Sequence, residues 1–255
     1  MIDRKLYKGY FLREAMNSWM CPTCNKGTLQ MEKEKFIFED NSITKQNAHN
    51  EDFNIPLDIG YTYTALLTCT NPKCGEVVTS SGVGYVDIVR QSYSPEGDIQ
   101  TEYEDYFRPL YFYPPIHIFK IPEDTPNNAK EAIESSFSLL FNHKQSAANQ
   151  VRVGLECLLT HLKIKRFKLN RRRKRIRLSL HERIDLLPPK YQHIKELCTA
   201  IKWLGNSGSH CGDEITFDDI FNGYDMLSFL LDEVYANRQE HAKKIAKKIN
   251  AKKGV

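Results

Sequence analysis

The chain has 255 residues, of which 41% are hydrophobic and 11% aromatic, so its composition excludes intrinsic disorder. Its apolar runs fall far short of the ~20 residues that a membrane-spanning helix requires, and its first residues lack the apolar core of a signal peptide. We therefore expect a cytoplasmic protein that does not contact a membrane. Residues 1–123 carry 12 Lys/Arg against 17 Asp/Glu, whereas residues 124–255 carry 24 against 15. This split predicts two domains with these bounds, the second of them facing an anionic partner.

Strand-like segments occupy the first domain. Residues 28–38 and 61–69 are rich in β-branched and aromatic side chains, and similar patterns follow at 83–90 and 103–113. The polar residues 40–55 predict a loop between the first two strands. The join to the second domain is marked by Pro114, Pro115, Pro122 and Pro126.

Apolar residues recur at helical spacing after the join. Thr125 is a candidate cap for a helix whose first residue would be Pro126. Apolar stripes then run through 145–162, 194–204 and 220–234. The sequence therefore predicts an α+β protein, in which a bundle of four or five helices follows a β-rich domain.

Three short signals predict where helices begin or end. Ser179 to Glu182 form a capping-box pattern at the start of one helix. Gly205 follows the stripe of residues 194–204 and is predicted to end that helix. Residues 216–219, Thr-Phe-Asp-Asp, cap the last long helix.

Two cysteine pairs in the β-rich domain are spaced as metal ligands. Cys21 and Cys24 form a C-x2-C pair, and Cys69 and Cys74 form a wider pair, with 44 residues between the two pairs. Four thiolates complete the tetrahedral coordination of zinc and leave no open position, which predicts a structural Zn²⁺ in a zinc ribbon. The alternative is four unrelated reduced thiols. Outside this group, Cys157 and Cys198 are expected to be core residues.

A dense run of positive charge follows the predicted helix of residues 145–162. Ten of the fifteen residues from 163 to 177 are Lys or Arg and none is acidic. Clustered cations are stable when solvated or beside an anion, so the run predicts a nucleic-acid contact. A solvated interhelical loop and an acidic protein partner are the alternatives. The densest part consists of Arg171, Arg172, Arg173, Lys174 and Arg175.

Residues 200–210, Ala-Ile-Lys-Trp-Leu-Gly-Asn-Ser-Gly-Ser-His, are the most distinctive segment. With the Arg-Val-Gly-Leu-Glu segment of residues 152–156, they resemble a prokaryotic family of helical domains that are often fused behind a zinc ribbon. That family is similar to the HEPN superfamily (higher eukaryote and prokaryote nucleotide-binding domains). The resemblance covers residues 114–236. It implies an RNA-associated binding or effector protein that forms a homodimer and has protein partners in an antiphage defence system.

Many HEPN proteins are metal-independent ribonucleases with an Arg four to six residues before a catalytic His. Here Asn206 and His210 match the family's turn, but no Arg occupies the signature position. Lys202 and Arg152 are the candidate replacement cations, with His210 as the candidate proton carrier. Arg175 and His181 also have the spacing of this Arg and His signature. We interpret this match as coincidence, because an Arg-rich run beside any His contains such a pair.

Three hypotheses follow for the function. The first is a nucleic-acid-associated binding or effector protein, with RNA as the expected ligand. The second is a ribonuclease that uses His210 with Asn206 and a cation from Lys202, Arg152 or a partner subunit. The third is a non-catalytic protein-interaction scaffold, whose zinc ribbon and basic run contact proteins only. Separately, Gly205, Asn206 and His210 could simply shape a turn, and Arg152 could pair with Glu156 on one helix.

Overall fold

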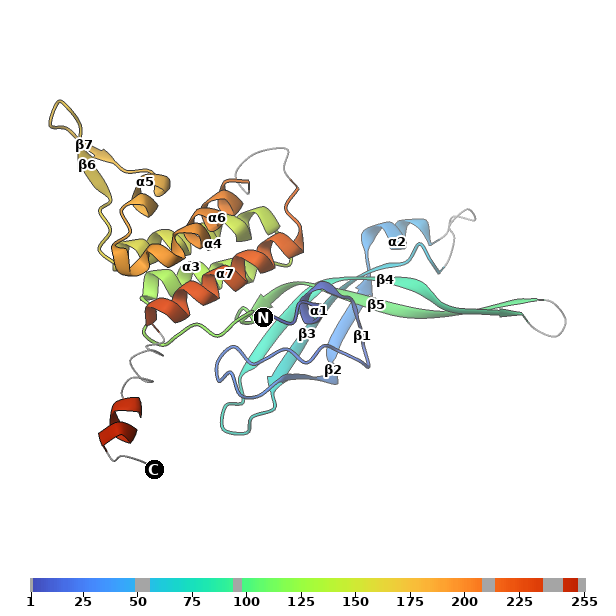
Figure 1. Cartoon of the computed structure of the whole chain (residues 1–255). Coiled ribbons are helices and arrows are strands. Elements are labelled where there is room, and N and C mark those ends of the chain that lie inside the picture. The colour runs from blue at the N-terminus through green and yellow to red at the C-terminus, as the bar shows by residue number, and fades with distance from the viewer. Residues whose placement is uncertain (1, 49–55, 94–97, 208–213, 236–244, 252–255) are drawn as a thin grey trace. The chain divides into compact units, whose positions relative to one another are not determined.

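The structure is a computed structural model that describes residues 2–48, 56–93, 98–207, 214–235 and 245–251. The chain is α+β, with an antiparallel sheet first and helices after it (Figure 1). Its contacts form two compact units, a sheet unit of residues 3–117 and a helical unit of residues 118–255 with Ile2. Composition predicted the division after residue 123. The contacts place it after His117, because Phe119 packs against Phe137 and Tyr224 of the helical unit.

The sheet unit contains one five-stranded antiparallel sheet in the order β1-β5-β4-β3-β2. Strands β4 and β5 pair out to Tyr93 and Ile99, whereas β3 pairs with β4 only as far as Tyr85. The far parts of β4 and β5 therefore form a two-stranded arm, which is visible in Figure 1. The elements are α1 (Lys5–Lys8), β1 (Phe11–Leu12), β2 (Leu29–Asp40), α2 (Ser42–Asn47), β3 (Gly60–Cys69), β4 (Val77–Tyr93) and β5 (Ile99–Tyr113).

One face of this sheet carries an aromatic core. Alternate residues of β3 are buried, as the period of two along a strand requires. Phe107 is fully buried and lies 4.8 Å from Phe36 and 5.6 Å from Tyr63, measured between ring centroids. Such edge contacts between rings add to the free energy gained by burying their apolar area. The core is completed by Phe11, Trp19 and Phe112.

The helical unit is built around α4, which contacts α3, α5, α6 and α7. The predicted apolar stripes face this core, and Val151, Leu155 and Tyr224 are fully buried. The Tyr224 hydroxyl lies 2.8 Å from Ser136 Oγ, which in turn donates to the carbonyl of Ala147. The elements are α3 (Asn127–Leu139), α4 (Lys144–His161), β6 (Phe167–Leu169), β7 (Arg175–Arg177), α5 (Leu180–Asp185), a 3₁₀ helix (Pro189–Ile194), α6 (Lys195–Ser207) and α7 (Phe217–Tyr235).

Two predicted helix starts are confirmed. Ser179 and Glu182 form a reciprocal capping box at the start of α5. Thr216 Oγ1 accepts from the Asp219 amide, and the Asp219 carboxylate accepts from the Thr216 amide, at the start of α7. At α3 the prediction was wrong by one residue. Pro126 has an extended ψ of 144° and is the N-cap rather than the first helical residue, and it receives no side-chain cap from Thr125.

Two other predictions are corrected, and the basic run takes a form that the sequence did not indicate. The segment 40–55 contains the helix α2, which Asn41 caps by accepting from the Thr44 amide. The basic run, for which a solvated interhelical loop was one alternative, forms a hairpin of β6 and β7. Gly205 does not end a helix, because α6 continues to Ser207. A Cβ at Gly205 would lie 2.4 Å from Arg152 Cβ, so this glycine allows α4 and α6 to approach closely.

No helix among the described residues is both long enough and apolar enough to cross a membrane.

Candidate metal centre and basic hairpin

The four predicted cysteines lie together at one end of the sheet. The ligand atoms of Cys21, Cys24, Cys69 and Cys74 all lie within 4.8 Å of one another. The Sγ atoms of Cys24 and Cys69 are 3.6 Å apart, and those of Cys21 and Cys74 are 3.9 Å apart. Four sulfur atoms at ~2.3 Å from a metal, on the corners of a tetrahedron, would be separated by about 3.8 Å. The cluster therefore has the dimensions of a four-thiolate metal site.

The strand pairing explains how the two cysteine pairs meet. Leu29, at the start of β2, pairs with Cys69, at the end of β3, so the turns that carry the two pairs share one edge. Gly27 makes this approach feasible, since a Cβ there would lie 2.7 Å from Cys69 Sγ. Gly75 has a φ of +61°, which a glycine adopts without strain.

Backbone amides already favour thiolate at part of this cluster. The amides of Gly27 and Lys26 lower the pKa of Cys24 to about 6, and the Gly27 amide lies 3.4 Å from its Sγ. Burial raises the pKa of Cys69 to about 12, and the neighbouring thiols add to this shift. A bound cation would reverse that second shift, because a metal favours the deprotonated ligand. The cluster can therefore hold a metal, and Cys69 is the ligand whose ionisation depends most on it.

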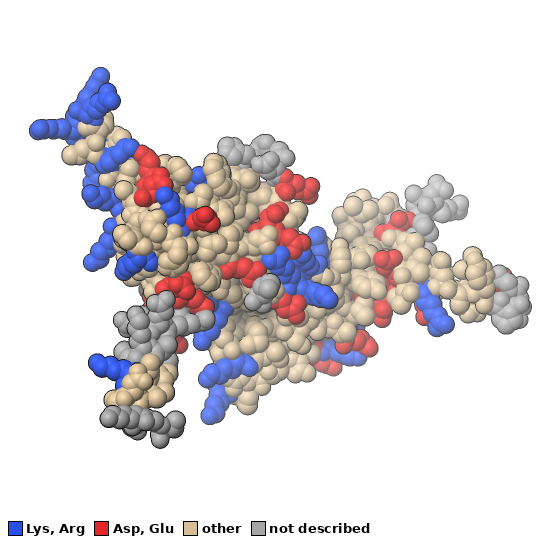
Figure 2. All heavy atoms as spheres, viewed as in Figure 1, with Lys and Arg blue, Asp and Glu red and all other residues tan. Residues whose placement is uncertain are grey.

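The basic run forms a β-hairpin with a tight, polar turn. Strand β6 pairs with β7 from Phe167 and Arg177 to Leu169 and Arg175. Asn170 closes the turn, as its side chain accepts from the amides of Arg172 and Lys174. Arg173 takes a φ of 54° there. The hairpin therefore presents its cations on a defined backbone, and in Figure 2 they form the blue tip that projects from the helical unit.

Two cations at the base of the hairpin have acidic partners, whereas those at its tip have none among the described residues. Lys168 pairs with Glu182 of α5, and Arg177 lies 3.3 Å from Glu156 of α4. Arg175 lies over the Phe167 ring at 3.8 Å. The tip residues Arg171 to Lys174 are exposed and form no ion pair with any described residue. The base thus attaches the hairpin to the helices, and the tip keeps uncompensated positive charge.

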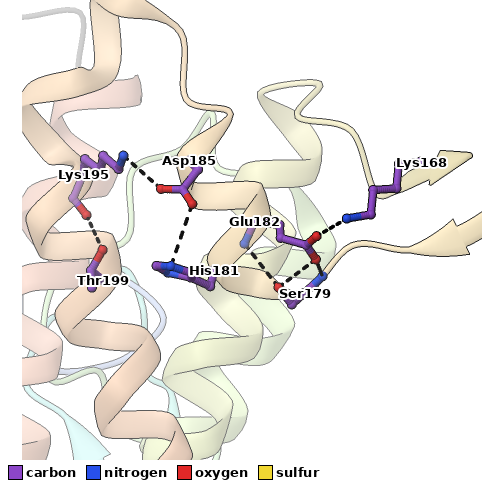
Figure 3. Close-up of polar contacts among 7 residues, drawn as sticks. All are labelled: Lys168, Ser179, His181, Glu182, Asp185, Lys195 and Thr199. Atoms are coloured by element: carbon purple, nitrogen blue, oxygen red, sulfur yellow. Dashed lines mark hydrogen bonds and ion pairs between the residues drawn. The ribbon is translucent and has the colours of Figure 1, made fainter. Parts of the chain in front are cut away.

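Figure 3 shows how α5 supports this attachment. The Glu182 carboxylate accepts from the Ser179 amide and hydroxyl and also pairs with Lys168. These interactions, led by the hydrogen bond from Lys168, lower the pKa of Glu182 to about 2. The exposed His181 lies 3.8 Å from Asp185, which also accepts from Lys195 at 2.9 Å. His181 therefore contacts Asp185 on the exposed side of α5.

The candidate catalytic residues are brought together in part. Arg152 Nη1 of α4 donates to Asn206 Oδ1 of α6 at 2.8 Å, and its Nε lies 3.5 Å from Glu156. Lys202 is buried, and its Nζ lies 3.4 Å from the ring centroid of Trp203. His210 lies outside the described residues. The sequence did not indicate that Arg152 bridges Asn206 and Glu156, since the three residues come from two helices.

The remaining cysteines and an apolar pocket complete the description of this region. Cys198 is fully buried in α6, which confirms it as a core residue, and Cys157 is half-buried in α4. A pocket of about 800 Å³ lies beside the hairpin, lined by Phe167, Leu169, Leu178 and Leu186 together with cations of the basic run. Sequence reasoning missed this pocket, because its walls form only when the hairpin folds back toward α5.

Comparison with known proteins divides the chain in the same two parts. Residues 9–112 match the model of a domain of unknown function (DUF8608), and residues 134–252 match that of another domain of unknown function (DUF4145). No curated protein and no solved structure matches the chain. The two halves are therefore similar to two separate domain families: the four-cysteine cluster lies within the first match, and the basic hairpin, Arg152 and Asn206 lie within the second.

Proposed function

We propose that this protein binds nucleic acid, RNA in particular, through the tip of its basic hairpin. The observation that carries the proposal is the charge of residues 171–174, which are exposed on a hydrogen-bonded turn and form no ion pair with a described residue. Lys and Arg that neutralise phosphates release condensed counterions, and this release supplies most of the affinity of non-specific nucleic-acid binding. A solvated loop would not require a hydrogen-bonded turn that holds like charges side by side.

The choice of RNA rests on the HEPN-like character that we propose for the helical unit. Its support is the pairing of Arg152 with Asn206 on neighbouring helices, at the positions where this chain resembles that superfamily. A role in antiphage defence and a homodimeric state belong to the same proposal. They follow from the resemblance alone.

We infer that the metal of the four-cysteine cluster is zinc with a structural role. The donor set is four sulfur atoms at tetrahedral spacing, and soft thiolates select zinc among the common divalent ions. Four thiolates occupy every coordination position, so the ion would stabilise the turns that carry the cysteines. It would not activate water.

A metal-independent ribonuclease is the second candidate function. The hydrogen bond between Arg152 and Asn206 favours it, because it holds a guanidinium beside Asn206, which lies four residues before His210. Such a cation can stabilise the charge that develops on a phosphate while a His moves the proton. Glu156 also contacts Arg152, and this ion pair equally fits a purely structural role.

The test changes Arg171, Arg172, Arg173, Lys174 and Arg175 to Gln together and measures RNA binding at several salt concentrations. We expect the affinity to fall by at least about tenfold, and the salt slope to fall by about 0.7–0.9 for each phosphate that the variant no longer neutralises. The same strands are then inspected for cleavage in the presence of EDTA. Cleavage that is abolished in Arg152→Gln or His210→Ala would establish the second candidate.

The matched control removes five exposed cations from the sheet unit. It carries the same change in net charge, so a general electrostatic effect would weaken both variants equally. An unchanged affinity and slope in the hairpin variant would reject the proposal and favour a protein-interaction scaffold. The control variant replaces Lys26, Lys33, Lys45, Lys73 and Arg90 by Gln.

A further inference from the structure

A second concentration of positive charge lies at the base of the hairpin, away from its tip. An open pocket of about 410 Å³ is lined by residues of α4, α5 and both strand ends. Four arginines line it, namely Arg152, Arg166, Arg177 and Arg183. These residues are far apart in the sequence, and only the folding of the hairpin against α4 and α5 brings them together.

Arg183 forms the buried floor of this pocket. It is 4% exposed, and its two terminal nitrogens donate to the Glu156 carbonyl and to Thr160 Oγ1 at 3.3 and 2.9 Å. Its Nε is buried and has no hydrogen-bond partner within the described part of the chain. Burial lowers the pKa of Arg183; the nearby Glu156 raises it, and the nearby Arg166 and Arg177 lower it. A buried cation beside two others is costly unless an anion compensates it.

The carboxylates of the pocket are too few and already engaged. Glu156 is shared between Arg152 and Arg177. Glu182 accepts from Ser179 and pairs with Lys168. Arg166 and Arg183 form no ion pair with any carboxylate among the described residues. The pocket therefore retains positive charge after every protein partner has been counted.

We propose that this pocket binds a phosphomonoester group. A phosphomonoester carries about −1.5 to −2 charge at pH 7 and three strong acceptor oxygens, whereas an internal phosphodiester carries only one charge. Arg166 and Arg177 are exposed at the mouth, where their planar N–H groups can reach phosphate oxygens. Arg183 supplies fixed positive charge from beneath. The pocket therefore fits a compact dianion. The extended phosphodiester backbone of a nucleic acid is the ligand that we propose for the hairpin tip.

The phosphate can come from two sources, the end of a nucleic-acid strand or a free small phosphate. Only the strand end rests on the proposed binding of RNA. Inorganic phosphate tests the pocket by itself, so failure of the pocket and failure of the RNA proposal remain distinguishable.

The experiment titrates the full chain with inorganic phosphate by calorimetry. In parallel, it measures the binding of one RNA sequence carrying a phosphate at the 5′ end, at the 3′ end or at neither. The pocket variant is Arg166→Gln with Arg177→Gln, both exposed positions. The control variant is Arg171→Gln with Arg173→Gln, which removes the same charge from the tip. Melting temperatures verify that both variants are folded.

We expect one phosphorylated strand to bind about tenfold more tightly than the unphosphorylated strand, as charge-assisted hydrogen bonds imply. The pocket variant should lose this difference, and the tip variant should keep it. Binding of inorganic phosphate that the pocket variant loses, without discrimination of strand ends, would assign the site to a free phosphate. If the wild-type chain binds neither millimolar phosphate nor a phosphorylated end preferentially, the proposal is overturned. It is equally overturned if the pocket variant binds phosphate as the wild type does.

Discussion

The two units of this protein reach a stable fold by different means. In the sheet unit, an aromatic core covers one face of the sheet, and the two cysteine turns converge on a cluster of sulfur atoms. In the helical unit, α4 is surrounded by other helices, and its apolar stripe is fully buried. The first unit thus combines apolar packing with a cluster of possible metal ligands, whereas the second is built around the packing of α4.

This difference determines how each unit should respond to perturbation. Metal binding is concentrated in one site, so the loss of a single ligand removes most of its contribution at once. Apolar packing is distributed over many side chains, so a single truncation removes only a part of it. Since contacts divide the chain into two units, a change in one unit should leave the other folded.

Replacing Cys69 by Ser should have the largest effect. The variant should lose the metal and unfold the sheet unit around the cysteine turns, because the binding of structural zinc contributes on the order of 10 kcal/mol. Elemental analysis gives the metal content, and hydrogen exchange shows which amides lose protection. The helical unit should keep its protection and its helical circular dichroism.

Cys157→Ser is the control for this experiment, since Cys157 lies in α4, outside the cluster. It should retain one zinc ion per chain. Freshly purified wild-type protein without metal would contradict the assignment of the cluster. Uniform loss of protection in both units would instead contradict the separation between them.

Replacing Phe137 by Ala should have an intermediate effect, confined to the helical unit. Phe137 is buried and lies within about 5 Å of the rings of Phe119 and Tyr224. Its truncation should lower the free energy of unfolding of this unit by about 3–5 kcal/mol. Urea unfolding followed by circular dichroism measures the loss, and the zinc content should not change. Phe229→Ala, at a 48% exposed position, should cost far less.

The elements that the sequence predicted well are those with a strong period or a specific cap. The stripe of α4, the capping box of α5 and the cap of α7 each depend on residues close together in the chain. The basic hairpin was not foreseen, because electrostatic repulsion argues against pairing two cationic strands. Contacts to Glu156 and Glu182, distant in sequence, compensate that repulsion. Gly205 was misplaced for a similar reason, since its role is set by Arg152 on another helix.

The candidate sites were predictable to different degrees. The four cysteines could be grouped from spacing, because two pairs of thiols in one β-rich domain have few other uses. The arginine pocket could not be predicted, since its four residues have no shared motif and only the folded hairpin collects them. The pairing of Arg152 with Asn206 lies between these cases, as both residues were candidates but their hydrogen bond was unknown.

The smallest predicted effect concerns the cap that joins the hairpin to the helical unit. Ser179→Ala removes the hydroxyl that accepts from the Glu182 amide, and it should lower the stability of the helical unit by about 1 kcal/mol. Ser179→Thr keeps the hydroxyl and should restore most of the loss.

Lys168 and Ser179 lower the pKa of Glu182 to about 2, below the value of ~4.3 in an unfolded chain. The contribution of the carboxylate is therefore fully present above pH ~4.3 and is lost as the pH falls toward about 2. Unfolding measured at about pH 7 and about pH 5 should accordingly show the same difference between wild type and Ser179→Ala, because both values lie above the unfolded pKa. If the stability difference between wild type and Ser179→Ala vanished at about pH 5, the cap would not keep the Glu182 carboxylate ionised at that pH.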